Sequence, residues 1–176
     1  SRRVPLEILA AVGGREPGTM RLRGVLRRVF DVLESLCARA TGPGWNPLVQ
    51  LGALGWFFFW ILAVSGVYLY IFFDTGITGT WESIEAISRD QWWAGGILRS
   101  LHRYASIALL VTAVVHMLRE YAHDRIRGNR WFAWITGLPL LLFIFVCGIT
   151  GYWLVWDVLA QFVAQTTFQL LLAVPL

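Results

Sequence analysis

The 176-residue sequence contains no lysine: all 15 basic residues are arginine, and only 11 residues are acidic. Exclusive use of arginine is typical of GC-rich genomes and indicates a bacterial source. Only two cysteines are present, 110 residues apart, and neither a CxxCH motif nor a cysteine cluster of the zinc-binding type occurs. No long apolar run lies within the first 30 residues, so we expect no signal peptide.

Charge is also missing from residues 48–73 and 131–156, which each run for 26 residues without a charged side chain. At 1.5 Å per residue, either segment can cross a hydrocarbon core of about 30 Å as a tilted helix. The whole chain is 57% hydrophobic with a mean hydropathy of +0.59, whereas soluble domains average about 45–50% apolar residues. We therefore expect an all-α membrane protein, with residues 97–118 as the middle one of three spans.

The remaining segments predict helices that lie at the membrane surfaces. Residues 20–40 repeat apolar side chains at helical spacing with arginines mostly off that stripe, which predicts a basic amphipathic surface helix or a helix packed on a partner subunit. Residues 157–176 are apolar but diluted by glutamine and threonine, which predicts an outer-interface helix and a link. The expected parts are thus a cytoplasmic segment (1–47), a three-span membrane domain (48–156) and the outer helix (157–176).

The arginines predict the orientation of the spans. Residues 1–47 carry eight arginines and four acidic residues, and residues 119–130 carry four arginines and two. Residues 74–96 hold four acidic residues and one arginine. Because arginine-rich segments stay in the cytoplasm, the N-terminus is expected there, in a multi-pass protein of the bacterial inner membrane. Lipid is then the partner of the basic segments, and no nucleic acid is expected.

Two of the three histidines, His102 and His116, lie fourteen residues apart inside the middle span. On an α-helix this spacing falls about 40° short of four turns and rises about 21 Å. Both imidazoles therefore share one face, at two depths in the membrane. Ionisable side chains at such depth indicate function, and imidazole is a common axial ligand of haem iron. The pair therefore indicates either two haem sites or two core histidines that are hydrogen-bonded to neighbouring helices.

Glycines repeat the same spacing on both other spans. Gly52 and Gly66 are fourteen residues apart, and so are Gly137 and Gly151. Glycine lets a helix backbone approach a flat group closely, although glycines at spacing four also serve helix packing. One spacing shared by three spans predicts two flat groups at two depths and favours two b-type haems.

An arginine lies one turn outside each histidine. Arg99 precedes His102 by three residues, and Arg119 follows His116 by three. Guanidinium groups pair planar carboxylates through two hydrogen bonds, so both are candidate ligands of haem propionates. The alternative is that both side chains only extend toward the membrane surface.

The stretches GGILRSLHRYAS, VVHMLR, WITG and GITGYWLVWD resemble the N-terminal, di-haem domain of the cytochrome b family, the short chloroplast-type branch most closely. The resemblance covers about residues 20–176. It implies that His102 holds an outer, low-potential haem b and His116 an inner, high-potential one. It also implies haem contacts for the four glycines, for both arginines and for Trp134, which precedes Gly137 by three residues.

Parts of the family pattern are missing. Family members carry a fourth span whose two histidines supply the opposing axial ligands, and this sequence reaches only the link LLLAVPL. Either the sequence is truncated, or another chain supplies that span, or the haems are ligated differently. The Pro-Glu-Trp-Tyr motif of the quinol-oxidation site is absent, and Val155 replaces a proline beside that site. The remaining histidine, His123, is expected to be solvated.

The expected function is transmembrane electron transfer through two haem b groups, as the cytochrome b subunit of a quinol-oxidising respiratory or photosynthetic complex. The implied partners are quinone, the fourth-span and C-terminal part of cytochrome b, a Rieske iron–sulfur protein and a c-type cytochrome, in a homodimeric complex. The alternative is a cytochrome b anchor that links a hydrogenase or dehydrogenase to the quinone pool. A haem-free structural subunit is a further alternative.

Overall fold

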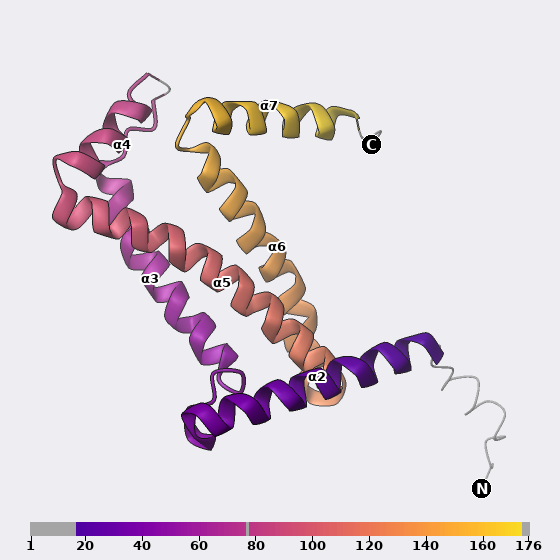
Figure 1. Ribbon diagram of the computed structural model, residues 1–176. Coiled ribbons are helices and arrows are strands. Elements are labelled where there is room, and N and C mark those ends of the chain that lie inside the picture. Colours follow the sequence, from indigo (N-terminus) through magenta and orange to yellow (C-terminus); the bar gives the residue numbers. More distant parts are fainter. Residues whose placement is uncertain (1–16, 77, 174–176) are drawn as a thin grey trace, which may run out of the picture.

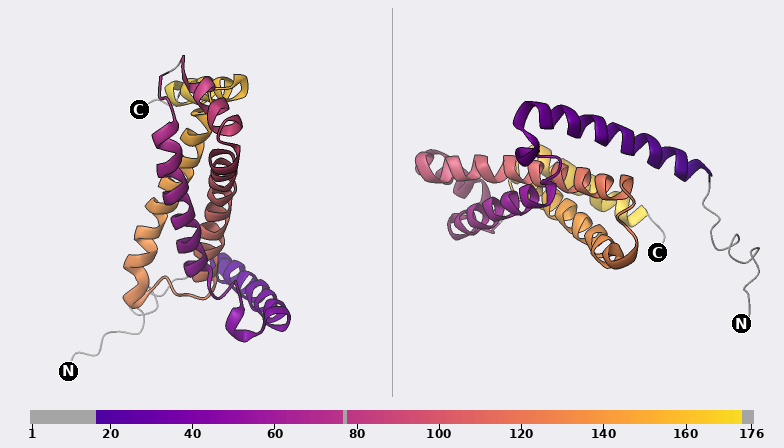
Figure 2. Two further views of the ribbon diagram at one scale, coloured as in Figure 1. Left: turned by 90° about the vertical axis from the view of Figure 1, so that its left-hand side faces the viewer. Right: turned by 90° about the horizontal axis from the view of Figure 1, so that it is seen from below.

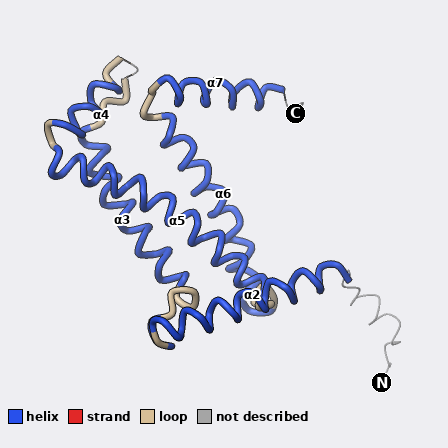
Figure 3. Tube along the Cα trace, viewed as in Figure 1, coloured by secondary structure: helices blue, strands red, loops and turns tan. Residues whose placement is uncertain are grey.

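The computed structural model describes residues 17–76 and 78–173, and all regular elements in that part of the chain are helices. The long helices are α2 (Pro17–Thr41), α3 (Leu51–Phe72), α5 (Ile97–Ala122) and α6 (Trp131–Trp153). The shorter helices are α4 (Thr80–Arg89) and α7 (Val158–Ala173). Figure 3 shows helices joined by short loops throughout the described chain, so the predicted all-α class is confirmed.

Three stretches are long and apolar enough to cross a membrane: α3, the continuous run Trp92–Ala122 that contains α5, and α6. They coincide with the three predicted spans within a few residues at each end. The arginines and histidines in the middle span do not interrupt it, because both residue types keep the backbone N–H and C=O groups that form the helical hydrogen bonds. Pro139 lies inside α6 and does not end it, as is common in membrane helices.

The middle span α5 holds the bundle together. It packs along α3 over most of its length and contacts α6 over a smaller area. Its residues Ala105, Leu109 and Thr112 are buried and recur at helical spacing, and a Cβ atom on Gly55 of α3 would lie 3.9 Å from the last two. Small side chains at such a crossing let two membrane helices approach closely. The interface between α3 and α5 is therefore the core of the described chain.

The other helices lie at the two ends of the bundle. Helix α2 crosses one end, whereas α4 and α7 lie at the opposite end, where α7 turns sharply away from α6 (Figure 1). The left-hand view in Figure 2 shows the same separation. We call these ends the α2 end and the α4 end. The predicted surface helices over 20–40 and 157–176 correspond to α2 and α7.

The sequence pattern of residues 74–96 predicts no helix, whereas the structure has α4 there. Its Ile84 and Ile87 are buried, and a Cβ atom on Gly95 would lie only 2.5 Å from the carbonyl oxygen of Ile87. Glycine at this position thus lets α4 pack directly against the π-helical turn Trp92–Gly96 that begins the middle span. Two buried isoleucines in ten residues give too short a repeat to distinguish a helix from a loop.

Candidate functional site

His102 and His116 both face α3, and each lies beside one of its paired glycines. A Cβ atom added to Gly66 would lie 3.2 Å from Cε1 of His102, and one added to Gly52 would lie 3.8 Å from Cε1 of His116. Because the two helices pack along their length, the equal spacing on each brings the residues into register twice. The structure thus contains two histidine–glycine pairs, at levels about 21 Å apart along α5.

The imidazole at the α4 end has a polar partner. Nδ1 of His102 lies 2.9 Å from Oγ of Ser65, the residue before Gly66. Ser65 is 1% exposed, and it is the most deeply buried side chain of α3. The hydrogen bond therefore fixes the ring from inside the helix interface.

The imidazole at the α2 end has no such partner. Nδ1 of His116 is buried and makes no hydrogen bond to any described residue. The residue before Gly52 is Leu51, which is buried and whose side chain cannot form a hydrogen bond. A buried ring nitrogen without a partner costs free energy unless a further group satisfies it.

Each arginine beside the histidines is held by a helix that lies at its own end of the bundle. Nη1 of Arg99 donates a hydrogen bond of 2.7 Å to Oγ of Ser88 on α4. Nε of Arg119 donates one of 2.6 Å to the Glu34 carboxylate of α2, and its side chain is only 7% exposed. The Arg119 charge is therefore already compensated by a partly buried ion pair, whereas the partner of Arg99 is neutral.

Helix α6 contributes to the site mainly at the α2 end. A Cβ atom on Gly137 would lie 3.3 Å from Sδ of Met117, the neighbour of His116, whereas one on Gly151 would meet nothing within 4 Å. Trp134 lies one turn before Gly137, and its indole Nε1 is buried without a partner among the described residues. The structure thus gives Gly137, at the α2 end of α6, a packing contact and leaves Gly151, toward the α4 end, facing open space.

His123 is not solvated, so that prediction is wrong. Its side chain is 14% exposed, its Nδ1 donates to the carbonyl oxygen of Arg119 at 3.0 Å, and its Nε2 lies 3.3 Å from the Asp31 carboxylate. The cause is α2, which covers the end of α5 and places Phe30 beside the ring. Both ring nitrogens of His123 therefore already face protein oxygens.

The sequence missed three residues that contact the predicted ones: Ser65, Ser88 and Glu34. Ser65 carried a signal, because it precedes Gly66 as Leu51 precedes Gly52 and is polar inside an apolar span. Ser88 and Glu34 lie outside the spans, and only the docking of α4 and α2 brings them to the arginines.

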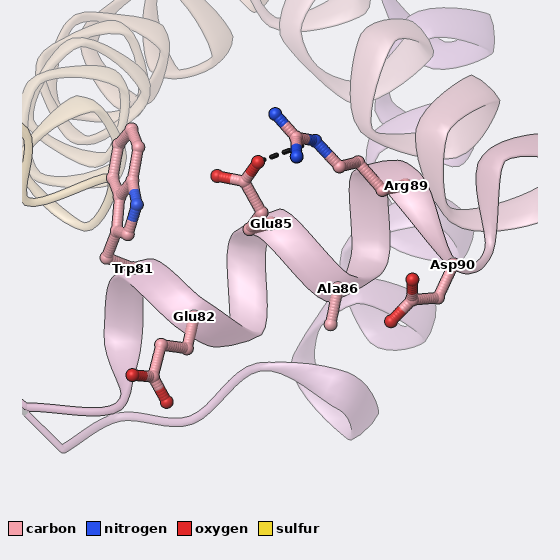
Figure 4. Close-up of a pocket in the computed structure, with 6 residues that line it drawn as sticks. All are labelled: Trp81, Glu82, Glu85, Ala86, Arg89 and Asp90. Atoms are coloured by element: carbon pink, nitrogen blue, oxygen red, sulfur yellow. Dashed lines mark ion pairs between the residues drawn. The ribbon is translucent and has the colours of Figure 1, made fainter.

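An open pocket of about 460 Å³ lies on the surface of α4, away from the histidines. Figure 4 shows its lining, in which Glu85 and Arg89 form an ion pair of 2.6 Å. The other lining residues are Trp81, Glu82, Ala86 and Asp90. Its polar groups lie on one short exposed helix, so we regard it as a feature of the surface of α4.

The family described as cytochrome b/b6/petB matches residues 39–176. The chain belongs to the cytochrome b/b6 family. The menaquinol:cytochrome c reductase cytochrome b subunit of Geobacillus thermodenitrificans is 30% identical over 125 residues, which are 71% of this chain and 55% of that protein. Cytochrome b6 of Prochlorococcus marinus (strain MIT 9515) is 22% identical over 148 residues, or 84% and 67%.

The predicted family is thereby confirmed, although the match begins at residue 39 and not at about residue 20. The corresponding subunit of Bacillus subtilis is 29% identical over 125 residues, again 55% of its length. The chain thus spans little more than half of the menaquinol:cytochrome c reductase subunits. Family membership and three apolar helices together make it a multi-pass membrane protein of a family that binds haem b.

The residues present fit haem b. Among the described residues, no three His, Cys, Asp or Glu side chains converge to hold a bare metal ion, whereas haem iron takes only its axial ligands from the protein. Ser65 occupies Nδ1 of His102 and leaves Nε2 for a metal, and His116 presents a buried nitrogen without a partner. Glycine beside each ring leaves the space that a side chain would fill.

Proposed function

We propose that this chain is the haem-carrying N-terminal part of a cytochrome b subunit, which passes electrons across the membrane in a quinol-oxidising complex. The observation that carries this proposal is the double register of His102 with Gly66 and His116 with Gly52 on one helix pair. When bound, haem b supplies reversible one-electron chemistry at its iron. The chain places two such sites at two depths and surrounds them with apolar helix.

In this proposal the chain contributes one axial ligand, His102 or His116, to each haem. Glycines on both neighbouring spans leave room for the flat macrocycle, and polar side chains would contact its edges. The glycines are Gly52, Gly66, Gly137 and Gly151. The polar side chains are Arg99, Arg119 and Trp134.

The second axial ligands are proposed to come from outside this sequence. Only His123 is left among the histidines, and both of its nitrogens face protein oxygens. A fourth span in the C-terminal part of cytochrome b would supply them. The relatives named menaquinol:cytochrome c reductase support quinol as the reductant. A Rieske iron–sulfur protein and a c-type cytochrome would accept the electrons, in a homodimeric complex.

The α2 end is proposed to face the cytoplasm of a bacterial inner membrane. The basic helix α2 and the arginine-rich segment after α5 lie at the same end of the bundle (Figure 1), which supports this orientation. The acidic helix α4 lies at the opposite end. The segment 1–47 would then be cytoplasmic, 48–156 would span the membrane, and 157–176 would lie at the outer surface.

The test is to purify the complex that contains the full chain and to count its haems. We expect a pyridine haemochrome assay to give two haem b per chain and a potentiometric titration to resolve two one-electron components. Co-purification of a Rieske protein supports the quinol-oxidising complex, whereas co-purification of a hydrogenase or dehydrogenase supports the anchor. A wild-type complex without b-type absorbance would contradict the proposal.

A matched pair of glycines on α6 tests the spacing itself. Cβ atoms on Gly148 and Gly151 would both meet nothing within 4 Å, so alanine at either position leaves the described packing intact. We expect Gly151→Ala to lower haem retention, because the proposal places a macrocycle there, and Gly148→Ala to leave it unchanged. Equal haem contents in the two variants would argue against a role for Gly151.

A further inference from the structure

Only two residues of helix α3 are fully buried in the described chain, Leu51 and Ser65. They are fourteen residues apart, and each directly precedes a glycine that faces a histidine. The same position in the two sites is thus apolar in one and polar in the other. A hydroxyl group buried at this depth costs free energy unless it is hydrogen-bonded, so its partners indicate why it is there.

The hydrogen bonds of Ser65 fix which atom donates. A serine hydroxyl has one proton, and Oγ of Ser65 lies 2.6 Å from the carbonyl oxygen of Ile61, which can only accept. The hydroxyl proton is therefore used toward Ile61. Nδ1 of His102, at 2.9 Å, must then donate its own proton to Oγ. In the neutral ring this leaves the lone pair on Nε2.

The other site cannot make this arrangement. The Leu51 side chain has no acceptor atom, and Nδ1 of His116 has no hydrogen-bond partner among the described residues. Its tautomer is therefore not set by α3.

We propose that Ser65 is a positioning residue: through its contact with Nδ1 it directs Nε2 of His102 to the iron and makes this ring a stronger donor than His116. The inference rests on the proposed function, because it assumes that both rings bind haem. When the ring nitrogen of a ligating histidine that does not bind the metal donates a hydrogen bond, the nitrogen that does bind the metal becomes more basic. The bond from Ser65 to Ile61 polarises Oγ and strengthens its acceptance. A stronger donor stabilises ferric iron and lowers the reduction potential.

The test uses Ser65→Ala in the complete complex, with both haems followed by potentiometric titration and electron paramagnetic resonance. We expect the potential of one component to rise while the other stays unchanged. Removing a hydrogen-bond partner of a ligating histidine changes metal affinity about tenfold. Confined to ferric iron, a tenfold change corresponds to about 59 mV in the reduction potential. Arg99 remains in place in this variant, so the shift reports the ring contact alone.

The matched control is Ser106→Ala on α5, since Ser106 donates to the backbone carbonyl of Arg103 in the same manner. We expect this variant to keep both wild-type potentials. The reciprocal variant, Leu51→Ser, offers an acceptor at the other site and is expected to lower the potential of the His116 component. If the complex with Ser65→Ala does not assemble, the Leu51→Ser variant still tests the inference.

The inference is overturned if Ser65→Ala retains both haems at the potentials of Ser106→Ala, or if Leu51→Ser assembles with an unchanged His116 component. Failure of the proposed function looks different, because the wild-type complex itself would then lack two b-type components.

Discussion

The two ends of α5 share one spacing but exchange their polar contacts. At the α4 end, the imidazole of His102 is hydrogen-bonded to Ser65, and Arg99 has only the neutral Ser88 as a partner. At the α2 end, Nδ1 of His116 has no described partner, and Arg119 is paired with a carboxylate. One end thus fixes the ring and leaves the arginine charge uncompensated, and the other end does the reverse.

The difference shows that the position of each site and its polar contacts have separate origins in the sequence. Positions along the spans set where the histidines and glycines lie, and they repeat because a helix repeats. The charges and hydrogen bonds around them come partly from α4 and α2, which differ in sequence and do not repeat. In the proposed function, Arg99 would give its whole charge to a haem carboxylate, whereas Arg119 would share its charge with Glu34.

The largest expected effect comes from removing the ligands one at a time. We expect His102→Ala to abolish one b-type component and His116→Ala to abolish the other, so that each variant retains half of the haem. The components should differ in potential, with the lower one lost in His102→Ala. His123→Ala is the control and should keep both haems. A His116→Ala variant with two haems would refute the ligand assignment.

The next effect tests how closely α3 approaches each ring. Alanine at position 66 places its Cβ atom 3.2 Å from a ring that Ser65 holds in place, whereas alanine at position 52 has 3.8 Å. Overpacking of this kind costs about 1–3 kcal/mol, so we expect Gly66→Ala to weaken haem retention about tenfold or more. Gly52→Ala also adds a methyl group where the proposal places a macrocycle, but its Cβ atom would lie 3.8 Å from the ring, so it should weaken haem retention less. Thermal release of haem from each variant, followed by absorbance, measures the difference. Equal losses would mean that the two rings are equally confined.

The spans and the histidine face could be predicted because they depend on local rules. Apolar length predicts α3 and α6, and the 3.6-residue period places His102 and His116 on one face of α5. Spacing alone also matched Gly66 and Gly52 to them, although nothing in the sequence specifies which faces of two helices meet.

The contacts between elements could not be predicted in this way. The Arg119–Glu34 pair joins residues 85 positions apart and depends on where α2 crosses the bundle. His123 was misjudged for the same reason, since its exposure is decided by Asp31 and Phe30 of α2. Loop residues are solvated by default, and only tertiary docking removes the water.

Burial decides the third expected effect. The Arg119–Glu34 and Arg89–Glu85 pairs have the same length, 2.6 Å, but the first arginine is 7% exposed and the second 78%. We expect Glu34→Gln to destabilise the docking of α2 by about 2 kcal/mol, because it leaves a buried guanidinium without its full counter-charge. Glu85→Gln should change stability by less than about 0.5 kcal/mol. Thermal unfolding in detergent compares them, and equal shifts would contradict the role of burial.

The smallest expected effect concerns Arg23, which makes another of the contacts between α2 and the end of α5. Nε of Arg23 donates to the carbonyl oxygen of Tyr121 at 2.9 Å, its guanidinium lies 5.0 Å from the centre of that ring, and its Nη2 pairs with the Asp124 carboxylate. Arg27, one turn further along α2, forms only an exposed pair of 3.9 Å with Asp31. We expect Arg23→Gln to weaken the docking of α2 by about 1 kcal/mol and Arg27→Gln to have no measurable effect. Hydrogen exchange of the α2 backbone amides reports the docking directly. Faster exchange in both variants would mean that the charge of α2, and not its contact with Tyr121, holds the helix in place.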